Sequence, residues 1–270
     1  MSSPDMTPRP ASTVLLLRDQ PAMGIEVLML RKNPRSEFAS GAYVFPGGAV
    51  EECDAALATM PHLYSGLDDP AASEVLGIES GGLSYFAAAI REAFEEAGIL
   101  IAYDAKGQVE LPVGTEIALR LDAARTSLNA GEADFYSILE SEESLQIAVE
   151  ELIYMSHWIT PVGPPRRYDT RFFAARAPEN QVALHEGGET VDTIWISPSE
   201  AIEAASRNEI EIMFPTLRHL EMIRDFKAVD EALAWARARV VPEVLPRVVS
   251  DSGGIRVLIP GDEGYEEASG

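Results

Sequence analysis

The sequence predicts a mixed α/β (α+β) fold in which strands from two regions of the chain flank an amphipathic helix. Two runs rich in leucine and β-branched residues, 12–17 and 25–31, surround a turn with Pro and Gly, which is typical of a strand hairpin. Apolar residues recur at helical spacing over 83–97. Aromatic and β-branched residues gather in three later runs with strand character, 154–160, 168–175 and 191–196.

The first half of the chain supplies the segments around this helix. Residues 1–10 are rich in Pro and Ser and are expected to be disordered. After the hairpin, residues 42–45 form a third short strand, which a Pro-Gly-Gly sequence ends. Residues 55–83 are polar and punctuated by Pro and Gly, so we expect an insertion there. Gly98 stands where a glycine ends a helix, and residues 99–102 are expected to return as a strand.

The second half is expected to add a helical cap and a mixed C-terminal part. The helical cap covers 114–152, where apolar residues alternate with many acids. Ser197 as N-cap and Pro198 at the first helical position predict the start of another helix. Two more helices and a final strand pair follow at 214–224, 227–238, 240–249 and 255–259. We therefore expect one domain over 11–263 and a C-terminal tail over 264–270.

The charge balance limits the partners of this chain. It has 44 acidic and 21 basic residues, a formal net charge of −23. A field of this sign repels nucleic acid and anionic membranes, so we expect neither as a partner, and a small phosphorylated substrate needs metal ions or a few placed basic residues. The one cysteine, Cys53, excludes an intramolecular disulfide. The sequence also shows no signal peptide and no apolar run of about 18 residues. Together with the single cysteine, these features indicate a cytoplasmic location.

The strongest chemical signal is an acidic helix face. Glu92 lies three residues from Glu95 and four from Glu96, so their carboxylates project from neighbouring points of one face and repel one another. Divalent cations such as Mg²⁺ take carboxylate ligands and would relieve this repulsion. The alternative is an exposed acidic face on which Arg91 and Glu95 form an ion pair worth about 0.2–0.5 kcal/mol.

The full pattern favours the metal site over that alternative. A strand ends in Phe45-Pro46-Gly47-Gly48, an acid follows at Asp54, and the helix reads Arg-Glu-apolar-Xaa-Glu-Glu-Xaa-Gly-Ile from Arg91. The sequence thereby resembles the Nudix hydrolases, whose signature is Gly, five residues, Glu, seven residues, then Arg-Glu-apolar-Xaa-Glu-Glu-Xaa-Gly-apolar. Asp54 stands where the family has Glu, and 36 residues rather than seven separate it from Arg91. A long insertion at this point is a feature of a subgroup similar to the mammalian peroxisomal coenzyme A diphosphatase.

The resemblance covers most of residues 12–263 and implies a Nudix α/β/α sandwich with a mixed sheet. It also implies hydrolysis of a nucleoside diphosphate linked to another group, with Mg²⁺ or Mn²⁺ as cofactor. The principal metal ligands it implies are Glu92 and Glu96, with Glu95 as a third ligand or an orienting acid and a carbonyl of Gly47 or Gly48 as an additional ligand. Arg91 is expected to hold Glu95 or a neighbouring carboxylate in position. The general base is left open between Glu92 and an acid of the 185–189 loop, with Glu189 first and Glu186 behind it; a solvated acidic turn is the alternative.

The candidates for substrate binding are basic. Arg31, Lys32 and Arg35 form a cluster suited to a phosphate group of coenzyme A, unless they are ordinary strand-end charges. Arg167 is a further candidate. A coenzyme A signature of related diphosphatases has Arg at the position where this chain has Glu37, which weakens the assignment of coenzyme A as the substrate. We expect Asp169 to form an internal salt bridge rather than to contact substrate, and the four histidines, His62, His157, His185 and His219, to be structural or surface residues.

Three functions stay open at this point. The first is a cytoplasmic, Mg²⁺-dependent Nudix hydrolase that cleaves coenzyme A or acyl-coenzyme A to 3′,5′-ADP and (acyl-)phosphopantetheine, with the insertion and the helical cap selecting the substrate. The second keeps the same chemistry but acts on ADP-ribose, NADH or another nucleoside diphosphate derivative. The third is a Nudix scaffold without turnover that binds a nucleotide as a regulator. A homodimer is compatible with each of them.

Overall fold

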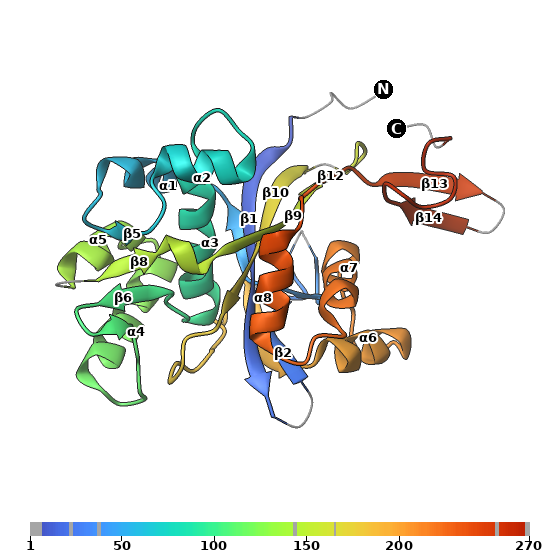
Figure 1. Ribbon diagram of the computed structural model, residues 1–270. Helices are drawn as coiled ribbons and strands as arrows, with labels where there is room; N and C mark the ends of the chain where they lie inside the picture. The colour runs from blue at the N-terminus through green and yellow to red at the C-terminus, as the bar shows by residue number, and fades with distance from the viewer. Residues whose placement is uncertain are drawn as a thin grey trace.

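A mixed sheet with helices on both faces forms the centre of the molecule (Figure 1). The computed structural model describes residues 7–21, 24–36, 39–142, 145–164, 166–251 and 254–267. Within them the main sheet has eight strands, with β11, β2, β1, β10, β9 and β12 in order, β3 beside β2 and β4 beside β1. Their bounds are β1 Arg9–Gln20, β2 Gly24–Lys32, β3 Tyr43–Val44, β4 Gly47–Ala49, β9 Ile153–Ile159, β10 Tyr168–Arg176, β11 Thr190–Ile196 and β12 Glu243–Val244.

The central strands of this sheet, β2, β1, β10 and β9, are largely buried on both faces. In β1, which pairs in parallel with β10, Val14 and Leu16 pack into the apolar cluster around α3 (Gly82–Ala97). Leu15 and Leu17 point to the opposite face and pack with α7 (Phe214–Ile223) and α8 (Val229–Ala238), because successive side chains of a strand alternate. The two apolar clusters and the sheet between them make the α/β/α sandwich that the resemblance implied.

The central helix α3 confirms the predicted helix over 83–97. Gly98 ends it with φ of +69°, a left-handed conformation that glycine adopts without steric cost. Phe86 anchors the helix on the sheet by packing against Phe173, with ring centroids 4.5 Å apart. The predicted strand over 99–102 is wrong for its first three residues, since β6 begins only at Ala102. Residues 99–101 are instead buried in the cluster around α3, which explains their apolar character.

The insertion is a packed part of the fold. It contains α1 (Glu52–Ala56), a 3₁₀ turn (Leu57–Thr59), β5 (Tyr64–Ser65) and α2 (Asp69–Leu76). Asp68 starts α2 by accepting a hydrogen bond from the amide of Ala71. Leu57 and Ala72 are fully buried in the cluster around α3.

The segment expected to be a helical cap is only partly helical. It holds α4 (Glu116–Asn129) and α5 (Phe135–Ser141), followed by β8 (Gln146–Ala148) and a 3₁₀ turn (Val149–Glu151). The helical prediction is wrong at β8, which joins β5, β6 (Ala102–Asp104) and β7 (Gly107–Gln108) in a small sheet beside α3 (Figure 1). Because its partners lie far away in the sequence, a local pattern could not reveal this strand.

The C-terminal elements largely confirm the predictions. α6 (Pro198–Ser206) starts at Ser197 with a capping box, and α7 (Phe214–Ile223) and α8 (Val229–Ala238) follow. β13 (Arg247–Asp251) and β14 (Gly254–Leu258) form the final strand pair, at one end of the molecule in Figure 1. The strand predicted over 240–249 is wrong before Arg247, since β12 within that range pairs with β9 of the main sheet instead.

The ends of the expected domain differ from the prediction in detail. β1 begins at Arg9, so the disorder predicted for residues 1–10 is wrong for Arg9 and Pro10, while residues 1–6 lie outside the described residues. Glu37, on which the altered coenzyme A signature depends, also lies outside them. Tyr265, in the expected tail, is buried and donates a hydrogen bond to the carbonyl of Leu245. Of the helices in the described part of the chain, none is long and apolar enough to cross a membrane.

Candidate active site

The acidic face of α3 packs closely against the glycines of β4. The amide of Gly47 donates a hydrogen bond to Glu96 Oε2 at 3.1 Å. A Cβ atom on Gly48 would lie 2.3 Å from Glu92 Oε1, so only glycine lets the strand approach this carboxylate so closely. The side chains of Glu92 and Glu96 are 12% and 7% exposed. The glycines and the glutamates of the predicted motif therefore meet in space, although the insertion separates them in sequence.

Arg91 holds this face together through five hydrogen bonds. Its Nη1 donates to Glu92 Oε1 at 2.8 Å and to Glu95 Oε2 at 3.0 Å. Its Nη2 donates to the carbonyl of Ala49 in β4 at 2.9 Å. Nη2 also donates to Asp54 Oδ2, and Nε donates to Asp54 Oδ1, both at 3.0 Å. The predicted positioning role of Arg91 toward Glu95 agrees with these contacts, which extend to Glu92 and to β4.

Asp54 is the buried anchor of Arg91. Its side chain is fully buried, and it also accepts hydrogen bonds from the amide of Glu51 and the hydroxyl of Tyr136, both at 2.8 Å. Two bonds to each oxygen use the usual acceptor capacity of a carboxylate. The structure therefore gives Asp54 the role of fixing the arginine.

A second cation, Lys32 at the end of β2, lies among the carboxylates. Lys32 Nζ is 2.6 Å from Glu96 Oε1 and 2.8 Å from Glu189 Oε1. The lysine side chain is 6% exposed, whereas that of Glu189 is 67% exposed. Lys32 thus connects the helix to the loop that precedes β11, and the structure brings the predicted base candidate Glu189 to the metal candidates.

The predicted basic cluster is therefore divided. Lys32 is buried inside the site, while its neighbour Arg31 and, further on, Arg35 are exposed, because adjacent residues of a strand point to opposite faces. Arg31 Nε donates to the carbonyl of Gly41. Arg167 lies away from this strand end in the chain and donates to the carbonyl of Thr160 at the end of β9. The structure does not gather these four residues into one surface.

Burial raises the pKa values of all three helix carboxylates. The pKa of Glu92 is raised to about 8, first by burial and then by Glu96 and Glu95, while Arg91 opposes the shift. Burial also raises the pKa of Glu95 and that of Glu96, against the lowering effects of Arg91 and Lys32 respectively. Ionising this face near neutral pH is therefore costly unless a further cation is present.

The residues present fit a hard divalent cation by their chemistry, since they offer carboxylate oxygens with elevated pKa values beside backbone carbonyls. Their side chains are not arranged as a set of metal ligands. Among the described residues, no three His, Cys, Asp or Glu side chains converge as a set of metal ligands. The carboxylates of Glu92 and Glu96 instead face Arg91 and Lys32.

Helix α4 fixes the end of α3 through a residue that the sequence prediction missed. Arg125 is 9% exposed and donates to the carbonyls of Glu95 at 3.0 Å and Leu184 at 2.7 Å. The amide of Leu184 in turn donates to the carbonyl of Ala97. Arg125 thus satisfies a free carbonyl at the end of α3 and docks the loop that leads to Glu189. Its position on the buried face of α4 was a signal available in the sequence.

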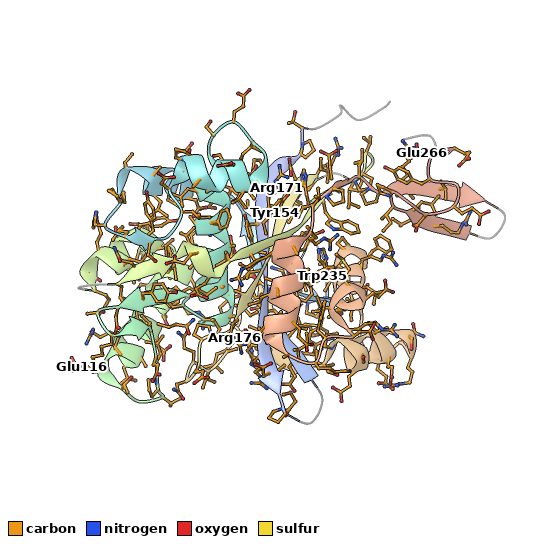
Figure 2. The ribbon with its side chains drawn as sticks, viewed as in Figure 1. Glu116, Tyr154, Arg171, Arg176, Trp235 and Glu266 are labelled. Atoms are coloured by element: carbon orange, nitrogen blue, oxygen red, sulfur yellow. The ribbon has the colours of Figure 1, made fainter. Side chains whose placement is uncertain are left out.

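The other polar residues singled out are structural. His157 Nε2 lies 2.6 Å from Asp169 Oδ1, which confirms the internal pair expected for Asp169. Arg171 donates to the hydroxyl of Tyr154, and Figure 2 shows these two side chains next to each other. His219 is fully buried and stacks on Phe172, and burial lowers its pKa to about 4.

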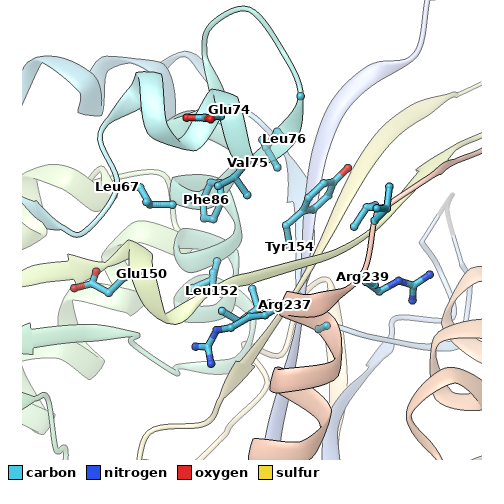
Figure 3. A pocket seen from close by; sticks show the side chains of 15 residues that line it. Leu67, Glu74, Val75, Leu76, Phe86, Glu150, Leu152, Tyr154, Arg237 and Arg239 are labelled. Carbon is cyan, nitrogen blue, oxygen red and sulfur yellow. The ribbon is translucent and has the colours of Figure 1, made fainter.

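A cavity of about 540 Å³ lies apart from the acidic face (Figure 3). Leu76 of α2, Phe86 of α3 and Tyr154 of β9 line it, together with the end of α8 at Arg237. None of the carboxylates on α3 lines this cavity. The acidic face therefore lies outside this cavity, between α3, β4 and the loop before β11.

An α/β/α sandwich whose central helix sets an Arg-Glu-Xaa-Xaa-Glu-Glu face against a glycine strand defines a Nudix hydrolase. The family model described as the NUDT19 Nudix domain matches residues 78–224, and the chain belongs to this family. This result confirms the predicted family and subgroup.

The relatives extend the similarity over nearly the whole chain. The acyl-coenzyme A diphosphatase NUDT19 of Homo sapiens is 26% identical over 97% of this chain and 78% of its own length. The protein of the same name from Gallus gallus is 29% identical over 90% of this chain and 73% of its own length. Among solved structures, the NUDIX hydrolase from Alicyclobacillus acidocaldarius aligns with a TM-score of 0.67 over 85% of this chain and 96% of that one, at 24% identity. The last comparison supports the fold.

Proposed function

We propose that this Nudix hydrolase cleaves the diphosphate of coenzyme A or acyl-coenzyme A to 3′,5′-ADP and (acyl-)phosphopantetheine. The observation that carries the reaction type is the carboxylate face of α3, packed against Gly48 and oriented by Arg91. The substrate follows from the family and from the names of the two vertebrate relatives, which cover this chain almost completely.

The cofactor in this proposal is Mg²⁺ or Mn²⁺. Glu92, Glu96 and Glu95 would hold it, together with the carbonyl of Gly48. A bound divalent ion supplies an activated water molecule and neutralises charge on phosphate oxygens. The elevated pKa values of the three carboxylates support this assignment, because a cation in contact with them favours their ionised forms.

The chain's own residues then position the reacting groups. Arg91 fixes the orientation of Glu92 and Glu95. Lys32 pairs with both Glu189 and Glu96. It thereby holds the exposed carboxylate of Glu189, which belongs to a loop, beside helix α3. Two residues are candidates to take the proton of the attacking water at a carboxylate oxygen: Glu92 on α3 and Glu189 in the loop before β11.

The candidates for substrate contacts in this proposal are exposed basic residues near the end of β2. Arg31 precedes the buried Lys32 directly and is exposed, as is Arg35 three residues further on. Both guanidinium groups suit bidentate contacts to phosphate. Arg167 is retained as a third candidate.

A substrate panel tests the proposal. Coenzyme A, acyl-coenzyme A, ADP-ribose, NADH and nucleoside triphosphates are incubated with Mg²⁺ or Mn²⁺ and wild-type protein, Glu92→Gln or the control Glu116→Gln, whose carboxylate is 90% exposed. We expect the wild-type protein to turn over coenzyme A derivatives. Glu92→Gln should lower this turnover by at least about a hundredfold, whereas Glu116→Gln should retain it. A preference for ADP-ribose by orders of magnitude would refute the substrate. Binding without turnover of any substrate would favour the regulator.

We also propose a cytoplasmic location, because a single half-buried cysteine suits a reducing compartment. Fractionation of cells that express the tagged protein checks this. A homodimer remains a proposal as well, and light scattering of the purified protein decides it.

A further inference from the structure

Tyr136 of helix α5 reaches the buried carboxylate of Asp54, which anchors Arg91 of α3. The tyrosine is 3% exposed, and its hydroxyl donates a 2.8 Å hydrogen bond to Asp54 Oδ1. Its ring packs against Phe135, with centroids 5.3 Å apart. The sequence assigned this helix to a cap that selects the substrate, whereas this contact connects it to the anchor of Arg91.

The bond from Tyr136 completes the surroundings of a buried carboxylate. Asp54 receives four hydrogen bonds, two from Arg91, one from the amide of Glu51 and one from Tyr136. A carboxylate with every acceptor position used has one favoured orientation, since any rotation breaks several bonds at once. The tyrosine hydroxyl and the amide approach different oxygens, so together they fix the plane of the carboxylate.

That plane determines where the guanidinium of Arg91 lies. Two of its five donors form a bidentate pair with Asp54, which is the most strongly directional contact that arginine makes. The opposite nitrogen, Nη1, contacts Glu92 and Glu95. Because the guanidinium is rigid and planar, a tilt at Asp54 is transmitted directly to both glutamates.

We propose that Tyr136 is a positioning residue of the active site, which acts through Asp54 and Arg91 to hold Glu92 and Glu95 in the orientation that the reaction needs. For its effect on turnover, the inference rests on the function proposed above. The contacts themselves do not depend on the identity of the substrate. It follows that α5, which was predicted as part of a helical cap, supports the orientation of the active-site residues.

Tyr136→Phe tests this inference, because it removes a single oxygen and leaves the ring packing in place. The matched control is Tyr103→Phe in β6, which also removes a hydrogen bond from a tyrosine to a carboxylate, that of Glu151 in the 3₁₀ turn after β8. The measurements are kcat and KM for the best substrate of the panel, the affinity for Mn²⁺ by electron paramagnetic resonance, and the melting temperature. Glu92→Gln serves as the reference for a disrupted site.

We expect Tyr136→Phe to lower kcat by about tenfold to a hundredfold, the ratio that corresponds to one hydrogen bond to a charged group, with KM changed less than about threefold. We also expect it to bind Mn²⁺ more weakly than wild type by at least about fivefold, since that affinity depends on the orientation of Glu92 and Glu95. Tyr103→Phe should match wild type in kcat and in Mn²⁺ affinity, even if both variants melt at lower temperature.

The inference is overturned if the two tyrosine variants have the same kcat and the same Mn²⁺ affinity. If wild type turns over no substrate, the proposed function fails, but the difference in Mn²⁺ affinity still decides the role of Tyr136. Should Tyr136→Phe not fold, Asp54→Asn provides the second test at low temperature, because it replaces one acceptor of the Arg91 pair by a donor. It should show the same loss of Mn²⁺ affinity, and unchanged affinity would refute the inference.

Discussion

Gly48→Ala probes the most closely packed contact of the site. The new Cβ would lie 2.3 Å from Glu92 Oε1, whereas ordinary van der Waals contact begins at 3.4 Å, so the carboxylate must withdraw by about 1 Å. A displacement of this size at a reacting group lowers a rate by about a hundredfold, which corresponds to about 2.7 kcal/mol in the activation free energy. We therefore expect kcat to fall by about this factor. The stability should change little, because the atoms in the way are the end of a side chain.

The assay compares kcat, Mn²⁺ affinity and urea unfolding for Gly48→Ala, Gly47→Ala and wild type. The neighbouring substitution meets backbone instead, with its Cβ 2.5 Å from the carbonyl oxygen of Ser12 and 2.8 Å from Thr13 Cα. It must open the pairing of β1 with β4, so it should lower the free energy of unfolding by about 1–3 kcal/mol. The two adjacent substitutions thus separate a catalytic effect from a structural one.

The reasoning is refuted if Gly48→Ala keeps wild-type kcat and Mn²⁺ affinity. That result would mean that the position of Glu92 beside β4 has no consequence for the reaction. A loss of stability in Gly48→Ala equal to that in Gly47→Ala would also contradict it, since it would show that the strand and not the carboxylate gives way.

Three further outcomes follow from the charges. The pKa of Glu92 is raised from 4.5 to about 8, so between these pH values the folded metal-free protein keeps a proton that the unfolded chain releases. Its free energy of unfolding should therefore fall by a few kcal/mol as the pH rises from 4.5 to 8. Urea titrations at several pH values should show this fall, and the fall should be smaller with Mn²⁺ present and in Glu92→Gln. Lys32→Met leaves the buried Glu96 without its cation and should lower the free energy of unfolding by about 3–5 kcal/mol, while the exposed Lys106→Met should have little effect. Arg125→Met removes two hydrogen bonds to backbone carbonyls and should speed hydrogen exchange in the loop before β11, with unchanged exchange there as the contrary result.

Much of the fold could be predicted because its elements carry local signals. The strands β1 and β2 are apolar runs, α3 has an apolar face and a terminal glycine, and α6 begins with Ser197 and Pro198. Each of these signals acts within a few residues along the chain, through side-chain periodicity or a cap. β8 has no such signal, because the partners that make it a strand come from the insertion and from β6.

The candidate site divides in the same way. By itself the sequence determined that Glu92, Glu95 and Glu96 share a helix face, since helical spacing requires no knowledge of distant contacts. The expectation that Gly47 and Gly48 only end a strand is wrong, because they pair with β1 as the short strand β4. Tertiary structure alone decided what surrounds these glutamates. It placed Lys32 between two carboxylates and made Asp54 the anchor of Arg91, both over long separations in the chain.

The physical reason is burial. Whether a charged side chain is a solvated surface group or a member of a network depends on which elements cover it, and those elements come from remote parts of the chain. Tyr136 and Arg125 look like ordinary helix residues in sequence, yet the packing of α5 and α4 beside α3 directs them to the acidic face and its end. The motif was therefore fixed by the sequence, whereas the residues that hold the motif in position were decided by the fold.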